Sequence, residues 1–219
     1  TLVLPGGEIV TLGGKCASQG GLDLLGLVTG SEGLLGMVVE VVVKILRKAP
    51  VTRTLLASFA SVPAAGQCVA RIIADGVVPA AMEFMDRRAA EAIEDYNAPG
   101  YPKGAEGILI MDADGVEADV SHAVSRITAI VAQCGGHTVE ATDEKQRMRI
   151  WSGRKAAFAA MGKLAPDMIG MDGTIPRHTL PAVLAEMEEL SHKHGLGFCN
   201  VFHAGDGNLH PLIIFDMMM

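Results

Sequence analysis

The sequence lacks an excess of basic residues, and this absence argues against one class of protein. Lysine and arginine number 18 against 25 aspartates and glutamates, which gives a formal net charge of -7. Because nucleic-acid-binding domains usually carry a basic face, this balance argues against a nucleic-acid partner. No basic segment precedes an apolar core at the N-terminus, so nothing there resembles a signal peptide.

Cysteines and long apolar runs are also scarce. The chain has only four cysteines, far apart and without a CxxC pair. This spacing excludes a disulfide framework and predicts reduced thiols in a cytosolic setting at Cys16, Cys68, Cys134 and Cys199. The longest apolar run, 34–43, is interrupted by Gly36 and Glu40 and is shorter than the ~18 residues of a membrane span. With 49% hydrophobic and 20% charged residues, the chain has the composition of one globular domain or two small ones.

The N-terminal part of the sequence predicts short strands and turns. Residues 1–12 form two apolar runs around Pro5-Gly6-Gly7, which predicts a hairpin. Residues 13–36 contain eight glycines in 24 positions, a composition that lets the backbone turn or approach a ligand closely. Valines alternate with polar residues over 37–46 and predict a strand, and Ala49-Pro50 is the expected domain boundary.

From Arg53 onward, strands alternate with helices and predict an α+β layer of ferredoxin-like order. Strands are expected at 53–59, 80–85, 107–112 and 137–141, and helices at 62–74, 87–96 and 116–133. Ser61 is the candidate N-cap of the first helix. A helix (143–161), a strand (168–175), a helix (180–194) and two closing strands (197–202 and 209–215) are expected to follow.

The most distinctive loop lies between the two closing strands. His203 and His210 flank a Gly-Asp-Gly turn, and imidazole is the commonest metal ligand in proteins. Asp206 and Asn208 are candidates to orient these ligands or to contact a substrate. The alternative is a turn with two incidental histidines, but four polar groups and two glycines between apolar strands favour a functional site. Two histidines still lack the third protein ligand that a divalent ion needs.

Two other segments are weaker candidates. Arg154 offers a planar guanidinium that suits a carboxylate, and a solvated helix face is the alternative interpretation. The turn 29–36 has small residues and backbone N–H groups that suit a phosphate or a ring oxygen. It lacks the P-loop ending and does not open a helix as a dinucleotide-binding GxGxxG does, so a bulged strand entry is its alternative.

Together these motifs resemble the FAD-linked oxidases of the vanillyl-alcohol oxidase superfamily, and within that family the flavin-binding subunits of bacterial glycolate oxidases. The resembling segments run in the same order along nearly the whole chain: 23–33, 55–59, 83–86, 151–155, 171–176 and 200–216. The last of these is the most specific.

The resemblance implies roles for particular residues. It implies an FAD site lined by Gly30, Ser31, Glu32, Gly33, Gly36 and Val38. It also implies that Arg154 holds the substrate carboxylate, that His203 and His210 bind a divalent metal (zinc, manganese or iron), and that Asn208 lies near flavin and substrate. Several relatives carry a lysine just before the position of Asp172, where this chain has Gly170 and Met171. The missing cation favours a small substrate such as glycolate over a dicarboxylate.

A domain division and an assembly are also implied. Residues 1–49 would form the C-terminal part of a PCMH-type FAD-binding domain, and 50–216 a truncated, ferredoxin-like C-terminal substrate domain. The family's diphosphate-binding loop would precede Thr1, and a Gly-Glu-His-Gly motif with a third metal ligand and a catalytic base would follow Asp216. The expected partners are other glycolate oxidase subunits, one of them an iron–sulfur subunit, in the cytoplasm or peripherally at the inner membrane.

The activity implied by the resemblance is FAD-dependent oxidation of a small 2-hydroxy acid, glycolate to glyoxylate. A D-lactate or other D-2-hydroxyacid dehydrogenase is the first alternative, because the histidine pair and the carboxylate anchor are shared. A catalytically silent fragment or interaction module is the second alternative, because the diphosphate loop and the third metal ligand are not in this sequence.

Overall fold

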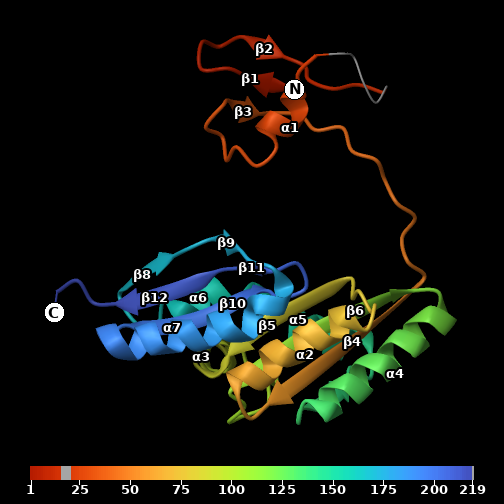
Figure 1. Cartoon of the computed structure of the whole chain (residues 1–219), viewed down its shortest axis with the longest axis vertical. Coiled ribbons are helices and arrows are strands. Elements are labelled where there is room, and N and C mark those ends of the chain that lie inside the picture. The colour runs from red at the N-terminus through yellow and green to blue at the C-terminus, as the bar shows by residue number, and fades with distance from the viewer. Residues whose placement is uncertain (16–20, 219) are drawn as a thin grey trace. The chain divides into compact units, whose positions relative to one another are not determined.

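The chain divides into two compact units, each with its own β-sheet. The computed structural model describes residues 1–15 and 21–218. The N-terminal unit comprises Thr1–Lys48 and the C-terminal unit comprises Ala49–Met219 (Figure 1). In the described ranges, no helix combines the length and the apolar character needed to cross a bilayer.

The N-terminal unit is a three-stranded antiparallel sheet with one short helix. Its strands are ordered β2-β1-β3, with β1 at Leu2–Val3, β2 at Ile9–Val10 and β3 at Met37–Val38. β1 and β2 form the predicted hairpin, in which Gly7 adopts a φ of +88° that favours glycine. The helix α1 (Leu24–Val28) was not expected from the sequence. It begins at Asp23, whose carboxylate accepts a hydrogen bond from the backbone N–H of Gly26 at 2.9 Å.

The prediction of a strand over 37–46 is wrong for the residues beyond Val38. Only Met37 and Val38 pair with β1, and residues 39–48 have no regular secondary structure. Their alternating valines satisfy the strand pattern, but a strand also needs a neighbour with free hydrogen-bonding groups. Beyond β3, this segment bonds to Thr1, the residue before β1, whose carbonyl accepts hydrogen bonds from the N–H groups of Val39 and Glu40.

The C-terminal unit contains the predicted ferredoxin-like layer. Four of its strands lie in the order β7-β4-β6-β5, and each neighbouring pair is antiparallel. This is the strand order of a βαββαβ unit, as the sequence predicted. The elements are β4 Val51–Phe59, α2 Val62–Ala74, β5 Ala81–Asp86, α3 Arg87–Asn97, β6 Gly107–Gly115, α4 Glu117–Gln133 and β7 His137–Glu140.

The later strands extend this sheet from the edge of β5. β10 pairs with β5, and the path continues through β11 to β9, while β12 pairs with both β10 and β8. The two strands predicted at 168–175 and 209–215 are each divided into two. The elements are β8 Asp167–Gly170, β9 Gly173–Thr174, η1 Arg177–Thr179, α7 Leu180–His194, β10 Gly197–His203, β11 Asn208–Leu209 and β12 Pro211–Phe215.

The helix predicted over 143–161 is also two helices, α5 (Glu144–Lys155) and α6 (Ala157–Met161). The last turn of α5 packs closely on Tyr101, because a Cβ at Gly153 would lie only 2.4 Å from the Tyr101 hydroxyl oxygen. The N–H of Ala156 then bonds to two carbonyls of that turn, which tightens it and ends the helix.

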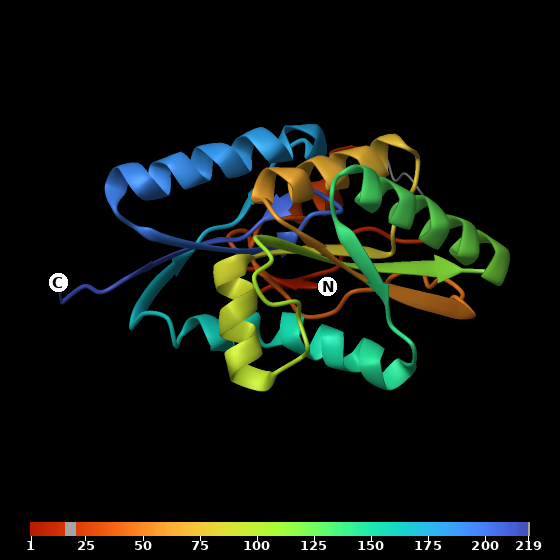
Figure 2. The same cartoon turned by 90° about the horizontal axis from the view of Figure 1, so that it is seen from below.

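Helices cover both faces of the C-terminal sheet (Figure 2). One core packs the sheet against α2, α4 and α7 and includes Phe84, and the other packs it against α3, α5 and α6 and includes Met85. These neighbours on β5 belong to different cores because successive side chains of a strand point to opposite faces. In the layer formed by α3, α5 and α6, the helix α5 covers the polar residues of the candidate site.

The described cysteines are free thiols, as predicted. Cys68, Cys134 and Cys199 form no disulfide, and Cys16 lies outside the described residues. Burial raises the pKa of the Cys68 thiol and raises that of Cys199 to about 12. Both thiols therefore stay protonated and pack as small apolar groups.

Candidate active site

A row of polar side chains crosses the C-terminal sheet on the face that α5 covers. Glu83 on β5 is the register partner of His203 on β10, and His203 is the partner of Asn208 on β11. The rings of His203 and His210 lie edge to face, with centroids 5.2 Å apart. Arg154 reaches the same row from the last turn of α5. The fold thus gathers the four residues that the sequence nominated as catalytic, although they come from α5 and from the β10–β12 region.

Glu83 connects Arg154 to His203. The Arg154 Nε donates a hydrogen bond to Glu83 Oε2 at 2.9 Å, and Nη2 lies 2.9 Å from the same oxygen. The other oxygen, Oε1, lies 2.7 Å from His203 Nδ1. The side chains of Arg154 and Glu83 are only 12% and 9% exposed. Arg154 is therefore not part of a solvated helix face.

The two histidines present the same nitrogen outward. His203 Nδ1 faces Glu83, and His210 Nδ1 lies 3.4 Å from Asp172 Oδ1. No described residue bonds to Nε2 of either ring, so Nε2 is the atom on each histidine that fits a metal ion. Among the described residues, no cluster of three or more His, Cys, Asp or Glu side chains is arranged to bind a metal. The residues that fit a metal ion are therefore the two imidazoles of His203 and His210, each with a carboxylate beside its Nδ1.

Asn208 contributes an unpaired acceptor to the row. Its backbone N–H donates to Asp206 Oδ1 at 3.1 Å, which shapes the turn. Its side-chain Oδ1 is buried and has no hydrogen-bond partner within the described chain. Because a buried polar atom without a partner is costly, this oxygen fits a donor on a bound molecule.

Two glycines allow the loop between His203 and His210 to fit against its neighbours. The N–H of Gly205 donates to the carbonyl of Met82 at 3.1 Å, which ties the loop to the end of β5. Gly207 adopts a φ of +79°, and its carbonyl accepts from Ile175 N at 3.0 Å. A Cβ at Gly207 would lie 2.3 Å from the carbonyl oxygen of Ile175, so only glycine fits there.

Gly207→Ala is accordingly expected to destabilise the protein by about 2 kcal/mol or more, because it adds left-handed backbone strain and a clash with backbone. Gly173→Ala is the matched control on the adjoining strand β9. A Cβ at Gly173 meets nothing within 4 Å. Urea unfolding of the two variants measures the difference, and equal stability of the two variants would contradict the account of this loop.

The predicted flavin-contacting residues form an exposed series of turns in the N-terminal unit. Gly30 and Gly33 adopt φ values of +79° and +82°, and Glu32 adopts +50°, which is unusual for a residue other than glycine. The N–H of Ser31 bonds to Val28 O, but no described partner is found for the N–H groups of Gly30, Glu32 and Gly33. Exposed N–H groups without partners in such turns suit anionic or ring oxygens, so Gly30, Glu32 and Gly33 fit the flavin role. Val38 is half exposed, and Gly36 is buried against β1.

Sequence reasoning assigned no role to two buried carboxylates, Glu83 and Asp112. Asp112 accepts hydrogen bonds from Thr54, from Trp151 Nε1 at 3.1 Å and from Arg147 Nη2 at 3.1 Å. Each is a charge flanked by apolar residues within a buried strand, and a buried charge requires a partner. This pattern in the sequence indicates that Glu83 and Asp112 have polar partners, but their partners on α5 could not be identified without the fold.

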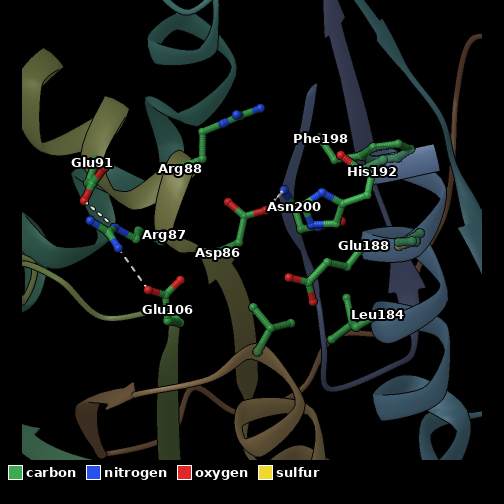
Figure 3. A pocket seen from close by; sticks show the side chains of 13 residues that line it. Asp86, Arg87, Arg88, Glu91, Glu106, Leu184, Glu188, His192, Phe198 and Asn200 are labelled. Carbon is green, nitrogen blue, oxygen red and sulfur yellow. Dashed lines mark hydrogen bonds and ion pairs between the residues drawn. The ribbon is translucent and has the colours of Figure 1, made fainter. Parts of the chain in front are cut away.

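A separate cavity of about 450 Å³ opens at the C-terminal end of β5, between α3 and α7. Its lining includes Asp86, Arg88, Glu188 and Asn200 (Figure 3). Asp86 follows Glu83 by three positions on β5, so the two side chains point to opposite faces. The cavity is therefore not part of the row that contains Arg154 and His203.

Asp86 is expected to make stability depend on pH. Burial raises the pKa of this carboxyl from its ordinary 3.8 to about 6, although the N–H groups of Ala89 and Asn200 donate to it. The folded protein holds the proton between these values whereas the unfolded chain loses it, so stability from this group is present below pH 4 and is lost as pH rises through about 6. The shift corresponds to ~3 kcal/mol.

Denaturant unfolding of the wild type and Asp86→Asn across pH 4–7 measures this effect. The free energy of unfolding of the variant is expected to rise relative to the wild type by ~3 kcal/mol over that range. A difference in the free energy of unfolding that is the same at every pH does not affect this comparison. Parallel pH profiles would show that Asp86 does not titrate differently in the folded protein.

Comparison with known proteins places this chain in a family. Residues 48–218 match the family model described as FAD linked oxidases, C-terminal domain. The chain belongs to this family. Its FAD-linked oxidase relatives include Glycolate oxidase subunit GlcD of Escherichia coli K12, with 51% identity over 96% of this chain and 42% of that protein. The corresponding subunit of Bacillus subtilis is 36% identical over 99% of this chain and 46% of its own length.

More distant relatives and solved structures agree on the fold of this FAD-linked oxidase chain. A mitochondrial D-lactate dehydrogenase [cytochrome] of Kluyveromyces lactis is 28% identical over 91% of this chain and 36% of its own length. The structure of p-cresol methylhydroxylase with substrate bound aligns with a TM-score of 0.69 at 14% identity, covering 100% of this chain and 51% of that one. The chain thus spans about half the length, or less, of the proteins that it resembles.

Proposed function

We propose that this FAD-linked oxidase chain takes part in the oxidation of glycolate to glyoxylate. The observation that carries the proposal is the arrangement in which the buried Glu83 connects Arg154 to His203, with His210 beside it. The relatives named glycolate oxidase subunits support glycolate as the substrate. Two compact units, 1–48 and 49–219, fit our assignment of an FAD-binding portion (1–49) and a substrate domain (50–216).

Arg154 would bind the substrate carboxylate through one edge of its guanidinium. Glu83 already occupies the edge formed by Nε and Nη2. The opposite edge, with Nη1 and the second hydrogen of Nη2, has the paired N–H geometry that suits a carboxylate. The only other described arginine on this face of α5, Arg147, is held by Asp112 and Glu144, so Arg154 provides the one free guanidinium edge on that face of the helix. That edge can bind one substrate carboxylate.

The charge balance of the row favours a divalent metal on His203 and His210. Glu83 neutralises Arg154, so a substrate carboxylate would add a negative charge to a partly buried site. The two Nε2 atoms would hold the ion, and the hydroxyl and carboxylate oxygens of a 2-hydroxy acid are suited to complete its coordination. When bound, a zinc, manganese or iron ion would lower the pKa of the substrate hydroxyl.

FAD, when bound, would supply the redox chemistry by accepting a hydride from C2 of the substrate. The turns that contain Gly30, Ser31, Glu32, Gly33, Gly36 and Val38 would contact it through the backbone N–H groups of Gly30, Glu32 and Gly33, which have no described partner. The buried, unpaired Oδ1 of Asn208 would accept a hydrogen bond from substrate or flavin and so orient one against the other.

We also propose an assembly with other glycolate oxidase subunits, one of them an iron–sulfur protein that takes electrons from the flavin. The bacterial relatives are named as subunits of glycolate oxidase, which supports an assembly. A cytoplasmic location, with peripheral contact at the inner membrane through those subunits, completes the proposal. Co-purification of an iron-containing partner with the tagged chain would test it.

A D-2-hydroxyacid dehydrogenase is the second candidate, because D-lactate dehydrogenases are among the relatives. A substrate panel of glycolate, D-lactate, L-lactate and 2-hydroxyglutarate, assayed with FAD and an artificial electron acceptor, separates the two. We expect kcat/KM to be highest for glycolate and lowest for 2-hydroxyglutarate, whose second carboxylate finds no second free arginine on the described face of α5 that carries Arg154. A higher kcat/KM for D-lactate would favour the second candidate.

A further inference from the structure

We propose that Glu83 is a positioning residue that fixes both the tautomer of His203 and the orientation of Arg154. The inference rests on the proposed function for its catalytic consequence, but the hydrogen-bond geometry stands without it. Glu83 touches neither the proposed substrate nor a metal. It acts through the two residues that would.

The first half of the role concerns His203. Glu83 Oε1 lies 2.7 Å from His203 Nδ1, and a carboxylate can only accept a hydrogen bond. The shared hydrogen therefore belongs to Nδ1, and Nε2 keeps its lone pair for a metal. Without Glu83, the ring would be free to carry its hydrogen on Nε2, which would then be unable to bind a cation.

The second half concerns Arg154. Both Nε and Nη2 meet Glu83 Oε2 at 2.9 Å, which fixes the plane and rotation of the guanidinium. The remaining edge is thereby held in one direction, away from the contact with Glu83. One carboxylate thus sets the direction of the proposed anion-binding edge and of the proposed metal-binding nitrogen.

The strand holds Glu83 firmly enough for this role. β5 is hydrogen-bonded to β6 on one side and to β10 on the other, and Glu83 is paired with Ile110 and His203 in those registers. Its side chain is 9% exposed. A partner of this kind, fixed by the sheet and shielded from water, can hold two flexible side chains at little cost in entropy.

Asp112 provides a matched control for the experiment. It is a buried carboxylate on the neighbouring strand β6, and it also binds side chains of α5, namely Arg147 and Trp151. It has no contact with His203 or Arg154 among its hydrogen bonds. A merely structural role for Glu83 would be shared by Asp112, whereas a positioning role would not.

The test compares Glu83→Gln, Glu83→Leu and Asp112→Asn in the full chain. Nitrogen-15 NMR of the imidazoles, without metal, reports which nitrogen of His203 carries the hydrogen. Zinc titration by calorimetry then reports metal affinity. In Glu83→Gln the amide oxygen is expected to turn to the charged Arg154 and its NH₂ group to face His203, which forces the hydrogen onto Nε2. Leucine removes both acceptors and covers the case in which the amide takes the other orientation.

We expect His203 to carry its hydrogen on Nδ1 in the wild type and in Asp112→Asn, and on Nε2 in the Glu83 variants. Loss of a partner that orients a ligand lowers metal affinity roughly 10–100-fold, so zinc should bind the Glu83 variants that much more weakly. An unchanged tautomer in both Glu83 variants would overturn the inference, as would equal loss of zinc affinity in Asp112→Asn. A wild type that binds no zinc would contradict the proposed metal site instead, and the tautomer result would still decide the role of Glu83.

Discussion

Arg154→Ala is expected to lower kcat/KM for glycolate about 100-fold and to raise KM, because the substrate carboxylate loses its charged partner in a partly buried site. Arg154→Lys is expected to recover little of this activity. A lysine ammonium is a point charge without the two edges that let Arg154 meet Glu83 and a second carboxylate together. Steady-state kinetics with glycolate measures both effects.

Lys155→Ala is the matched control for this series, because Lys155 is the next cation on α5 and is exposed. It should leave kcat/KM unchanged. Removal of Arg154 also leaves Glu83 buried without its cation, which costs ~3–5 kcal/mol. Circular dichroism must therefore show that the alanine variant is folded. A folded Arg154→Ala protein with wild-type kcat/KM would remove Arg154 from the substrate site.

His203→Ala is expected to abolish stoichiometric metal binding and, with it, glycolate oxidation. The variant removes one of two imidazole nitrogens, and a single imidazole holds a divalent ion far more weakly than a chelating pair. Elemental analysis of the purified protein measures the metal content directly. The described part of the chain holds no cluster of three or more His, Cys, Asp or Glu side chains arranged to bind a metal, so no other ligand set replaces the histidine pair.

His137→Ala is a suitable control, because His137 is an exposed histidine on β7 and takes no part in the row. It should keep full metal content. The metal assignment would be wrong if the His203→Ala protein retained as much metal as this control. Loss of metal in both variants would point to binding at surface histidines rather than at the row.

The local pattern of the sequence was sufficient for most of the C-terminal unit. Ser61 caps α2 by accepting from the N–H of Ala64, and α7 spans the residues expected from its periodicity. The local pattern was insufficient where contacts with residues distant in sequence decide the secondary structure. Residues 39–48 have strand composition but no strand beside them, and the last turn of α5 packs on Tyr101, which is distant in sequence.

For the candidate site, sequence identified the groups but not their connections. The histidine pair could be inferred because both residues lie on one short loop. The contact between Arg154 and His203 could not, because it passes through Glu83 on a strand that precedes both by more than 70 residues in the chain. Such a link depends on the register of β5 against β10, which local patterns do not specify.

The central claim is most directly tested by the visible absorption spectrum of the purified protein with FAD, recorded before and after glycolate is added without oxygen. The account predicts a bound-flavin spectrum that bleaches with glycolate and that bleaches far more slowly in the Arg154→Ala protein. A bound flavin that glycolate leaves oxidised, or a protein that stays colourless after reconstitution with FAD, would contradict it.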